Sequence, residues 1–260
     1  MRGARRIATS PEALPSSSGW LARAPSAPAA RAERPPLGVI TTGRPEQRLW
    51  QRANGCAPPR LGVSAGTGDG AVSALDEVLR EQVSGLVSFG IAAALAPAVE
   101  PGDLVVADVV AAPDGGSLAS DVRWRRALVE ELRAAGLAPL EARLAGADVL
   151  PGHTAERFRR FQATFAAAID TESHLVAAAA HASGLPFVAI RVVVDRLKQP
   201  TLATPALVVT PGGRWRRGIG QGLRRPWELA SALRGSRDLD QALAVLARAV
   251  PALARTAPAT

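Results

Sequence analysis

Tyrosine is absent from this sequence, and aromatic residues make up only 4% of it. Hydrophobic residues still account for 47% of the 260 positions, so the chain can bury a sizeable core, built mainly from alanine, valine and leucine. No apolar run approaches the roughly 18 residues that a membrane-spanning helix needs. The first residues carry arginines without an apolar stretch behind them, which argues against a secretory signal. We therefore expect a cytoplasmic protein, with any membrane contact peripheral and at the inner membrane.

Cysteine and histidine are nearly as scarce. Cys56 is the only cysteine, which excludes an internal disulfide and a cysteine metal cluster. The three histidines, at positions 153, 174 and 181, lack the spacing of a metal site. We therefore expect no metal and no other cofactor, and carboxylates are left as the groups that could carry chemistry.

Positive charge is concentrated in two segments. Residues 1–36 carry +4 and residues 196–227 carry +7, which leaves −3 for the rest of a chain whose total is +8. Residues 1–36 have no apolar period, and we predict a disordered basic tail rich in alanine, proline and arginine. Residues 37–260 are interpreted as one domain with a basic C-terminal extension from about residue 196. Such segments suit an anionic surface, although they also fit a general bias toward arginine, and no nucleic-acid recognition motif accompanies them.

Strand-like and helix-like segments alternate along the domain. A strand pattern precedes a helix pattern within residues 36–50 and again within 60–82. Further strands are predicted within residues 84–97, 101–112 (one strand or a pair), 140–151, 167–170 and 186–195, and further helices within 121–136, 154–165, 173–184 and 239–255. The alternation predicts one α/β domain around a mostly parallel or mixed sheet. The unbroken β-branched run at 186–195 is typical of a central buried strand.

Three carboxylates stand at or just beyond the ends of predicted strands: Glu46, Glu172 and Asp195. Ligands of open α/β sheets bind beyond the carboxyl ends of the strands. One buried carboxyl can act as a general acid, a second can activate water, and a third can accept hydrogen bonds from sugar hydroxyls. This set suits cleavage of an N-glycosidic bond, whereas each acid taken alone would equally fit a helix cap or a salt bridge.

A glycine-rich loop, "SAGTGDG" at residues 64–70, follows a predicted strand and precedes a helix. Backbone N–H groups of such a loop can bind a phosphate or a ribose. The pattern is common in βα connections, so by itself it indicates little.

Two longer motifs resemble the nucleoside phosphorylase and nucleosidase superfamily. They are "VSFGIAAALAP" with "VEPGDLVVADVV" in residues 87–110, and "IDTESHLVAAAAHASGLPFVAIRVVVD" in residues 169–195. The resemblance covers most of residues 37–195, and it is closest to the hopanoid-associated phosphorylase branch, the adenosylhopane nucleosidases. It implies a phosphorylase/hydrolase-like α/β fold, a three-layer αβα sandwich with a mixed central sheet. It also implies a homodimer that removes adenine from an adenosine with a lipid tail at the 5′ carbon, in hopanoid lipid biosynthesis.

The resemblance also implies roles for individual residues. Glu172 would bind the ribose hydroxyls, Asp195 would protonate or hydrogen-bond to N7 of the purine, and Glu46 would activate the attacking water. The other substrate-binding positions would be Gly90, Ala92, Ala93 and Thr171. If phosphate is the acceptor instead of water, it would be held by Arg44, Gly66 and Gly68.

Some positions depart from the family pattern. Ala93 and Ala94 replace paired glycines, Thr171 replaces a methionine, and Val194 fills a place often held by serine. These changes indicate either a pocket adapted to an unusual 5′ substituent or a homologue that binds nucleosides, or a membrane, without turnover. A soluble nucleosidase for methylthioadenosine or S-adenosylhomocysteine is the second enzymatic interpretation, against which Thr171 and the basic extension count.

Overall fold

The computed structural model describes residues 35–52, 59–64, 68–198, 207–210, 214–217 and 226–258, with side chains throughout except at 207–210, 214–217 and 226–236. All of these residues belong to one unit of the chain, Arg34–Thr260. The predicted disordered tail, apart from residues 35 and 36, lies outside the described residues. None of the helices in the described part is both long enough and apolar enough to cross a membrane.

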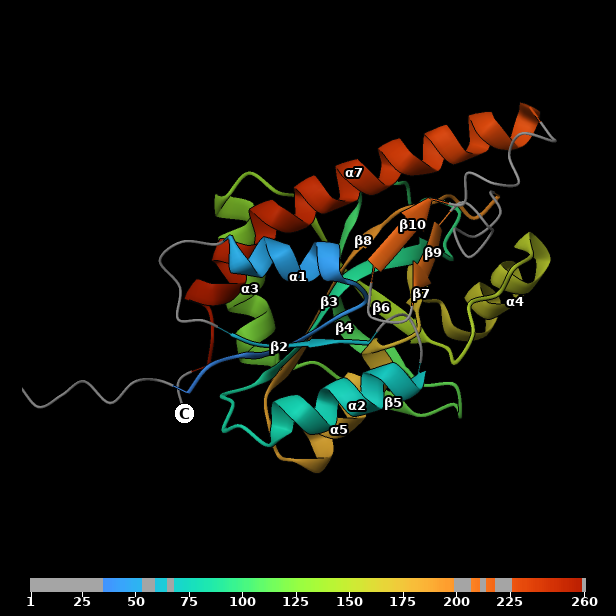
Figure 1. Cartoon of the computed structure of the whole chain (residues 1–260). Helices are drawn as coiled ribbons and strands as arrows, with labels where there is room; N and C mark the ends of the chain where they lie inside the picture. The colour runs from blue at the N-terminus through green and yellow to red at the C-terminus, as the bar shows by residue number, and fades with distance from the viewer. Residues whose placement is uncertain are drawn as a thin grey trace, which may run out of the picture. The chain divides into compact units, whose positions relative to one another are not determined.

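Strands and helices alternate as the sequence predicts (Figure 1). The strands are β1 (Gly38–Thr41), β2 (Arg60–Val63), β3 (Leu86–Ala94), β4 (Leu104–Ala111), β5 (Ser117–Ala119), β6 (Pro139–Gly146), β7 (Ala168–Asp170), β8 (Phe187–Val193), β9 (Leu207–Thr210) and β10 (Arg214–Arg217). The helices are α1 (Arg44–Gln51), α2 (Gly68–Leu79), α3 (Val122–Ala134), α4 (Thr154–Thr164), α5 (Ser173–Ala182) and α7 (Pro226–Arg255).

Glycine ends two of the helices, as expected. Gly136 follows α3 with φ +72° and Gly184 follows α5 with φ +64°, both in the left-handed region that favours glycine. After each glycine the next backbone N–H, of Leu137 or Leu185, donates back into the last turn. The chain can therefore turn sharply from each helix into the strand that follows.

Several elements differ from the sequence prediction. Residues 101–112 form one strand, β4, and the short strand β5 pairs with it antiparallel. β5 and the β9–β10 hairpin were not predicted. β3 extends through Ala94, so Ala93 and Ala94, which stand where the family pattern has paired glycines, lie in a strand. The reason is tertiary, since both residues pair with β7.

The sheet is mixed, as predicted. β3 runs parallel to β1 and β8, β8 runs antiparallel to β4, and β6 runs parallel to both β4 and β7. The end of β3 then pairs antiparallel with β7, which closes β3, β8, β4, β6 and β7 into a ring. This closure brings the carboxyl ends of β3, β7 and β8 together at one place.

Helices cover both faces of the sheet, which confirms the three-layer arrangement. On one face, α1 and α3 contact α7, and all three helices contribute to a hydrophobic core with the sheet. On the other face, α2 packs against α5 over a second core rich in alanine and valine. Figure 1 shows α1 and α7 above the sheet, α3 at its left side, and α2 and α5 below it. β8 lies between them and is buried along its whole length.

Candidate active site

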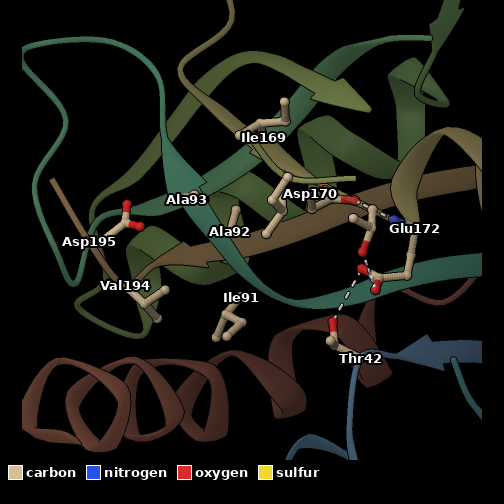
Figure 2. A pocket seen from close by; sticks show the side chains of 11 residues that line it. Thr42, Ile91, Ala92, Ala93, Ile169, Asp170, Glu172, Val194 and Asp195 are labelled. Atoms are coloured by element: carbon tan, nitrogen blue, oxygen red, sulfur yellow. Dashed lines mark hydrogen bonds between the residues drawn. The ribbon is translucent and has the colours of Figure 1, made fainter. Parts of the chain in front are cut away.

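A narrow pocket opens where β3, β7 and β8 end (Figure 2). Its volume of about 60 Å³ is below the roughly 300–1,000 Å³ of typical ligand sites, so a nucleoside could enter only with movement of its walls. The lining residues come from separate parts of the chain: Thr42, Ile91, Ala92, Ala93, Leu150, Ile169, Asp170, Thr171, Glu172, Val194 and Asp195. Five residues predicted as catalytic or substrate-binding are among them, namely Ala92, Ala93, Thr171, Glu172 and Asp195.

Asp170 shapes the turn that carries Glu172. Its Oδ1 accepts hydrogen bonds from the backbone N–H groups of Glu172 and Ser173, at 2.8 and 2.6 Å. Its Oδ2 accepts from the Ser173 hydroxyl. These bonds satisfy the free N–H groups at the start of α5, so Asp170 fixes the direction in which the chain leaves β7. The carboxylate next to Glu172 in the sequence is therefore structural.

Glu172 is buried and held by hydroxyl groups. Thr171 Oγ1 and Ser64 Oγ donate to its Oε1, at 2.7 and 3.2 Å, and Thr42 Oγ1 donates to its Oε2 at 3.3 Å. Burial raises the pKa of the Glu172 carboxyl, and the nearby Arg191 guanidinium opposes that rise. The side chain is thus fixed at the pocket wall by partners from β2, the β1–α1 loop and its own turn.

Arg191 of β8 is the cation around which the acids gather. Its side chain is fully buried, with Nε 3.1 Å from Asp170 Oδ2 and Nη2 3.3 Å from Glu172 Oε2. Nη2 also donates to the Ser88 hydroxyl, at 2.6 Å. The sequence pattern did not single out Arg191, although an arginine inside the apolar run 186–195 was a usable signal, because a buried charge needs partners.

Glu46 lies in the first turn of α1 and is fully buried, but it does not line the pocket. Its Oε2 accepts the backbone N–H of Gly43. The pKa of Glu46 is raised to about 8: burial and, to a smaller extent, the charge of Glu172 raise it, while Arg191 and the backbone N–H groups of Gly43 and Ile91 lower it. Burial is thus the main reason why the pKa values of Glu46 and Glu172 are raised, and Arg191 limits the rise.

Gly90 of β3 faces this charged cluster and is not among the residues that line the pocket. A Cβ at this position would lie 2.6 Å from Arg191 Nη1, 2.8 Å from Glu46 Oε1 and 3.0 Å from Thr42 Oγ1. Glycine is therefore required for the close packing of the polar side chains.

Asp195 follows β8 and is held by a different cation. Arg157 of α4, which is completely buried, places Nη2 2.6 Å from Asp195 Oδ1 and donates from Nε to the carbonyl oxygen of Ala94 at 3.0 Å. The backbone N–H of Ala94 donates to the same Oδ1 at 2.9 Å. No sequence pattern pointed to Arg157, because α4 carries further arginines at positions 159 and 160 and periodicity does not tell them apart.

Two of the three acids that line the pocket, Glu172 and Asp195, stand apart. Figure 2 shows Asp195 at one end of the pocket and Glu172 with Thr42 at the other, with Ala92, Ile91 and Val194 between them. An apolar wall with a fixed carboxylate at each end suits a ligand with a flat or apolar middle and hydrogen-bonding groups on both sides.

The predicted phosphate-binding residues that the structure describes lie outside the pocket lining. Arg44 is exposed at the start of α1, Gly68 begins α2, and neither lines the pocket. Gly66 lies outside the described residues. In the described part of the chain, no three histidine, cysteine, aspartate or glutamate side chains gather as a metal site.

Comparison with known families gives one match. The model described as "Phosphorylase superfamily" matches residues 62–209, more than half of the chain. Among curated proteins, no sequence matches the chain significantly.

Solved structures of low sequence identity share the fold. Helicobacter pylori futalosine hydrolase has a TM-score of 0.65 at 12% identity, over 84% of this chain and 97% of the other. The 5′-methylthioadenosine/S-adenosylhomocysteine nucleosidase of Helicobacter pylori, with a bound butyl-thio-DADMe-Immucillin-A, has a TM-score of 0.67 at 12% identity, over 85% and 98%. The corresponding nucleosidase of Neisseria meningitidis has a TM-score of 0.62 at 19% identity, over 84% and 97%.

Proposed function

Because this chain belongs to the phosphorylase superfamily, we propose that it cleaves the N-glycosidic bond of a 5′-substituted adenosine and releases adenine. One observation carries the proposal: Glu172 and Asp195, from the ends of two different strands, line the same pocket and are each held rigidly by buried partners. The names of the structures that share this fold, two of them nucleosidases and one a futalosine hydrolase, agree with this chemistry.

The two acids would act on opposite ends of the substrate. Glu172 would accept hydrogen bonds from the ribose hydroxyls and stabilise positive charge on the sugar as the bond to the base breaks. Asp195 would lie beside the purine and favour protonation at N7, which makes adenine a better leaving group. Ile91, Ala92 and Val194 would contact the base and sugar between them.

We propose water as the attacking group. Arg191 is already paired with two carboxyls, those of Asp170 at 3.1 Å and Glu172 at 3.3 Å. A phosphate anion would add negative charge to this cluster, whereas water would not. Glu46 does not line the pocket, so it would reach that water only through the movement of the walls that entry of a nucleoside requires, and in its ionised form it would then orient or deprotonate the water.

An apolar 5′ substituent fits the surface next to the pocket. Leu150 lines the pocket, and its neighbour Val149 is 80% exposed. On α4 and just beyond it, Phe158 and Phe165 are 41% and 76% exposed. This apolar surface supports a substrate with a lipid tail, such as adenosylhopane, and with it peripheral contact of a cytoplasmic enzyme with the inner membrane. A homodimer is the assembly that the family resemblance implies.

A soluble nucleosidase for methylthioadenosine or S-adenosylhomocysteine is the second candidate. The favouring observation is the small volume of the pocket, which suits a small 5′ group better than a large one. A homologue that binds nucleosides without turnover is the third, and it would share the pocket but not the chemistry.

Release of free adenine separates these candidates. The substrates are a 5′-alkyl adenosine with a long apolar tail, methylthioadenosine and S-adenosylhomocysteine, each with and without phosphate and in the presence of lipid vesicles. Adenine from the long-tailed compound alone, independent of phosphate, is the expected result. Adenine mainly from the thionucleosides would move the protein to the second candidate, and none from any substrate, with binding still measurable, would overturn enzymatic function.

A further inference from the structure

A groove runs between α1 and α7, on the helical face that carries these two helices. Its volume is about 310 Å³, and it is lined by Pro45, Arg48, Leu49, Arg52, Leu243, Ala244 and Ala247. The lining thus combines apolar side chains from both helices with two arginines from α1. It is separate from the candidate active site, since the two sets of lining residues have no member in common.

The exposed side of α1 is an arginine stripe. Arg44, Arg48 and Arg52 follow one another at intervals of four residues and are all exposed. Residues four apart lie on the same face of a helix, so the three guanidinium groups point to the same side. No carboxylate of the described residues forms an ion pair with any of them. Among the carboxylates whose side chains are described, none therefore neutralises this stripe.

A second segment with basic residues in its sequence, β10, lies next to α1. β10 has the sequence Arg-Trp-Arg-Arg, and its backbone contacts α1 (Figure 1). In the sequence, α1 and β10 are more than 150 residues apart, so only the fold brings the two basic segments together. Tryptophan among basic residues is typical of protein surfaces in the headgroup layer of a membrane.

We propose that the α1–α7 groove and the arginine stripe form a docking surface for an anionic phospholipid membrane. Arg48 and Arg52 would bind headgroup phosphates, and Pro45, Leu49 and Leu243 would contact the upper part of an acyl chain. Nucleic acid would use the arginines but not an apolar groove, which is why the lipid is favoured. The inference rests on the membrane contact in the proposed function and adds a second surface for it, besides the apolar residues on α4, and it can be tested without any enzymatic assay.

Membrane binding at this surface would also affect the candidate active site, because α1 contributes residues to both. The same short helix carries Arg48 and Arg52 on its exposed side and Glu46 and Trp50 on its buried side. A membrane bound to the outer side would restrain the helix that positions Glu46. The site proposed for lipid and the site proposed for nucleoside are thus connected by less than three turns of helix.

The test is co-sedimentation of the full chain with vesicles of phosphatidylcholine, with and without 30% phosphatidylglycerol. We expect binding only to the anionic vesicles. Arg48→Gln/Arg52→Gln should weaken the partition coefficient about thirty-fold, the effect of removing two arginines near such a surface. Arg123→Gln/Arg126→Gln is the matched control, because both residues are exposed on α3 and the charge change is identical. If vesicle binding falls as much in the control variant, or does not fall in the groove variant, then net charge or another segment binds the membrane. Either result would contradict the proposed docking surface.

Two further experiments test whether the groove itself takes part in binding and whether its ligand is a membrane or a nucleic acid. Ala244→Glu places an acid in the groove at an exposed position and should weaken vesicle binding, whereas Ala134→Glu on α3 should do so much less. Binding of a single-stranded RNA oligonucleotide is measured for the same variants. If RNA binds more tightly than anionic vesicles, and Arg48→Gln/Arg52→Gln abolishes that binding, the surface belongs to a nucleic acid and the membrane proposal fails. Adenine release from the long-tailed 5′-alkyl adenosine, dispersed in detergent without vesicles, reports separately on the proposed function.

Discussion

Arg157 and Asp195 form a buried ion pair at one end of the pocket, with 2.6 Å between Nη2 and Oδ1 and neither side chain more than 3% exposed. The pair joins α4 to the residue that follows β8, so the position of the proposed catalytic carboxylate depends on a helix that is distant in the sequence. Arg157 is therefore a positioning residue.

Arg157→Met should lower kcat for adenine release more than it raises KM, because Asp195 would lose its orientation while the pocket walls stay in place. Loss of one partner of a buried pair also lowers the free energy of unfolding by about 3–5 kcal/mol. Rates are therefore measured well below the midpoint of thermal unfolding. Arg157→Lys, which keeps the charge, should recover part of kcat, and Arg159→Met, exposed on the same helix, is the control. Wild-type kcat in the folded Arg157→Met variant would disprove the positioning role.

Asp195→Asn should reduce kcat by about 10²- to 10⁴-fold, the range of a lost general acid, with a much smaller change in KM. The amide can still fill the space of the carboxylate but cannot favour a proton on the purine in the same way. Steady-state kinetics on the best substrate give the two constants. Equal changes in kcat and KM would show that Asp195 only binds.

Glu172→Gln should remove adenine release by at least about 10²-fold while the chain stays folded, because a neutral amide no longer stabilises charge on the sugar. Circular dichroism and thermal unfolding check the fold. Glu77→Gln, an exposed residue of α2, serves as the matched control. Retention of full turnover by Glu172→Gln would mean that the site is assigned wrongly.

Glu46 makes stability depend on pH. Its pKa rises from 4.5 to about 8 in the folded chain, so the folded state holds a proton that the unfolded state releases. The contribution of Glu46 to stability is complete below pH 4.5 and is lost as the pH rises through about 8. Glu46→Gln removes the titration. The free energy of unfolding of this variant, relative to that of wild type, should therefore increase by a few kcal/mol when the pH is raised from 5 to 8.5, at about 1.4 kcal/mol per pKa unit.

Urea unfolding at both pH values measures this difference. An equal effect of Glu46→Gln at pH 5 and pH 8.5 would contradict the raised pKa. The same variant should also lose the rise of kcat/KM with pH that a water-activating carboxylate produces as it ionises near pH 8.

Gly90→Ala should damage both stability and activity, because the new Cβ would lie within 3.0 Å of Arg191, Glu46 and Thr42. Overpacking of this kind destabilises by about 1–3 kcal/mol. Gly152→Ala is the control, since a Cβ there meets no atom within 4 Å. Thermal unfolding and adenine release are measured on both variants. Unchanged values for Gly90→Ala would show that the polar cluster is looser than the distances indicate.

Much of the fold could be predicted from local patterns. The long apolar run at 186–195 indicated β8, and the helix stops at Gly136 and Gly184 were visible as glycines after periodic segments. The family match likewise bears out the predicted enzyme superfamily. The short strand β5 could not be predicted, because its three residues gain stability only from pairing with β4.

The sequence by itself determined the order of strands and helices and the presence of acids near strand ends, since both follow from the spacing of apolar and polar residues along the chain. Only the tertiary structure decided which acids share a pocket and which cation holds each one. Closure of β3 onto β7 brought Asp195 and Glu172 to one site, and it left Glu46 behind Gly90. The physical reason is that burial of a charge is tolerated only where partners converge from distant segments, and that convergence is a property of the folded chain.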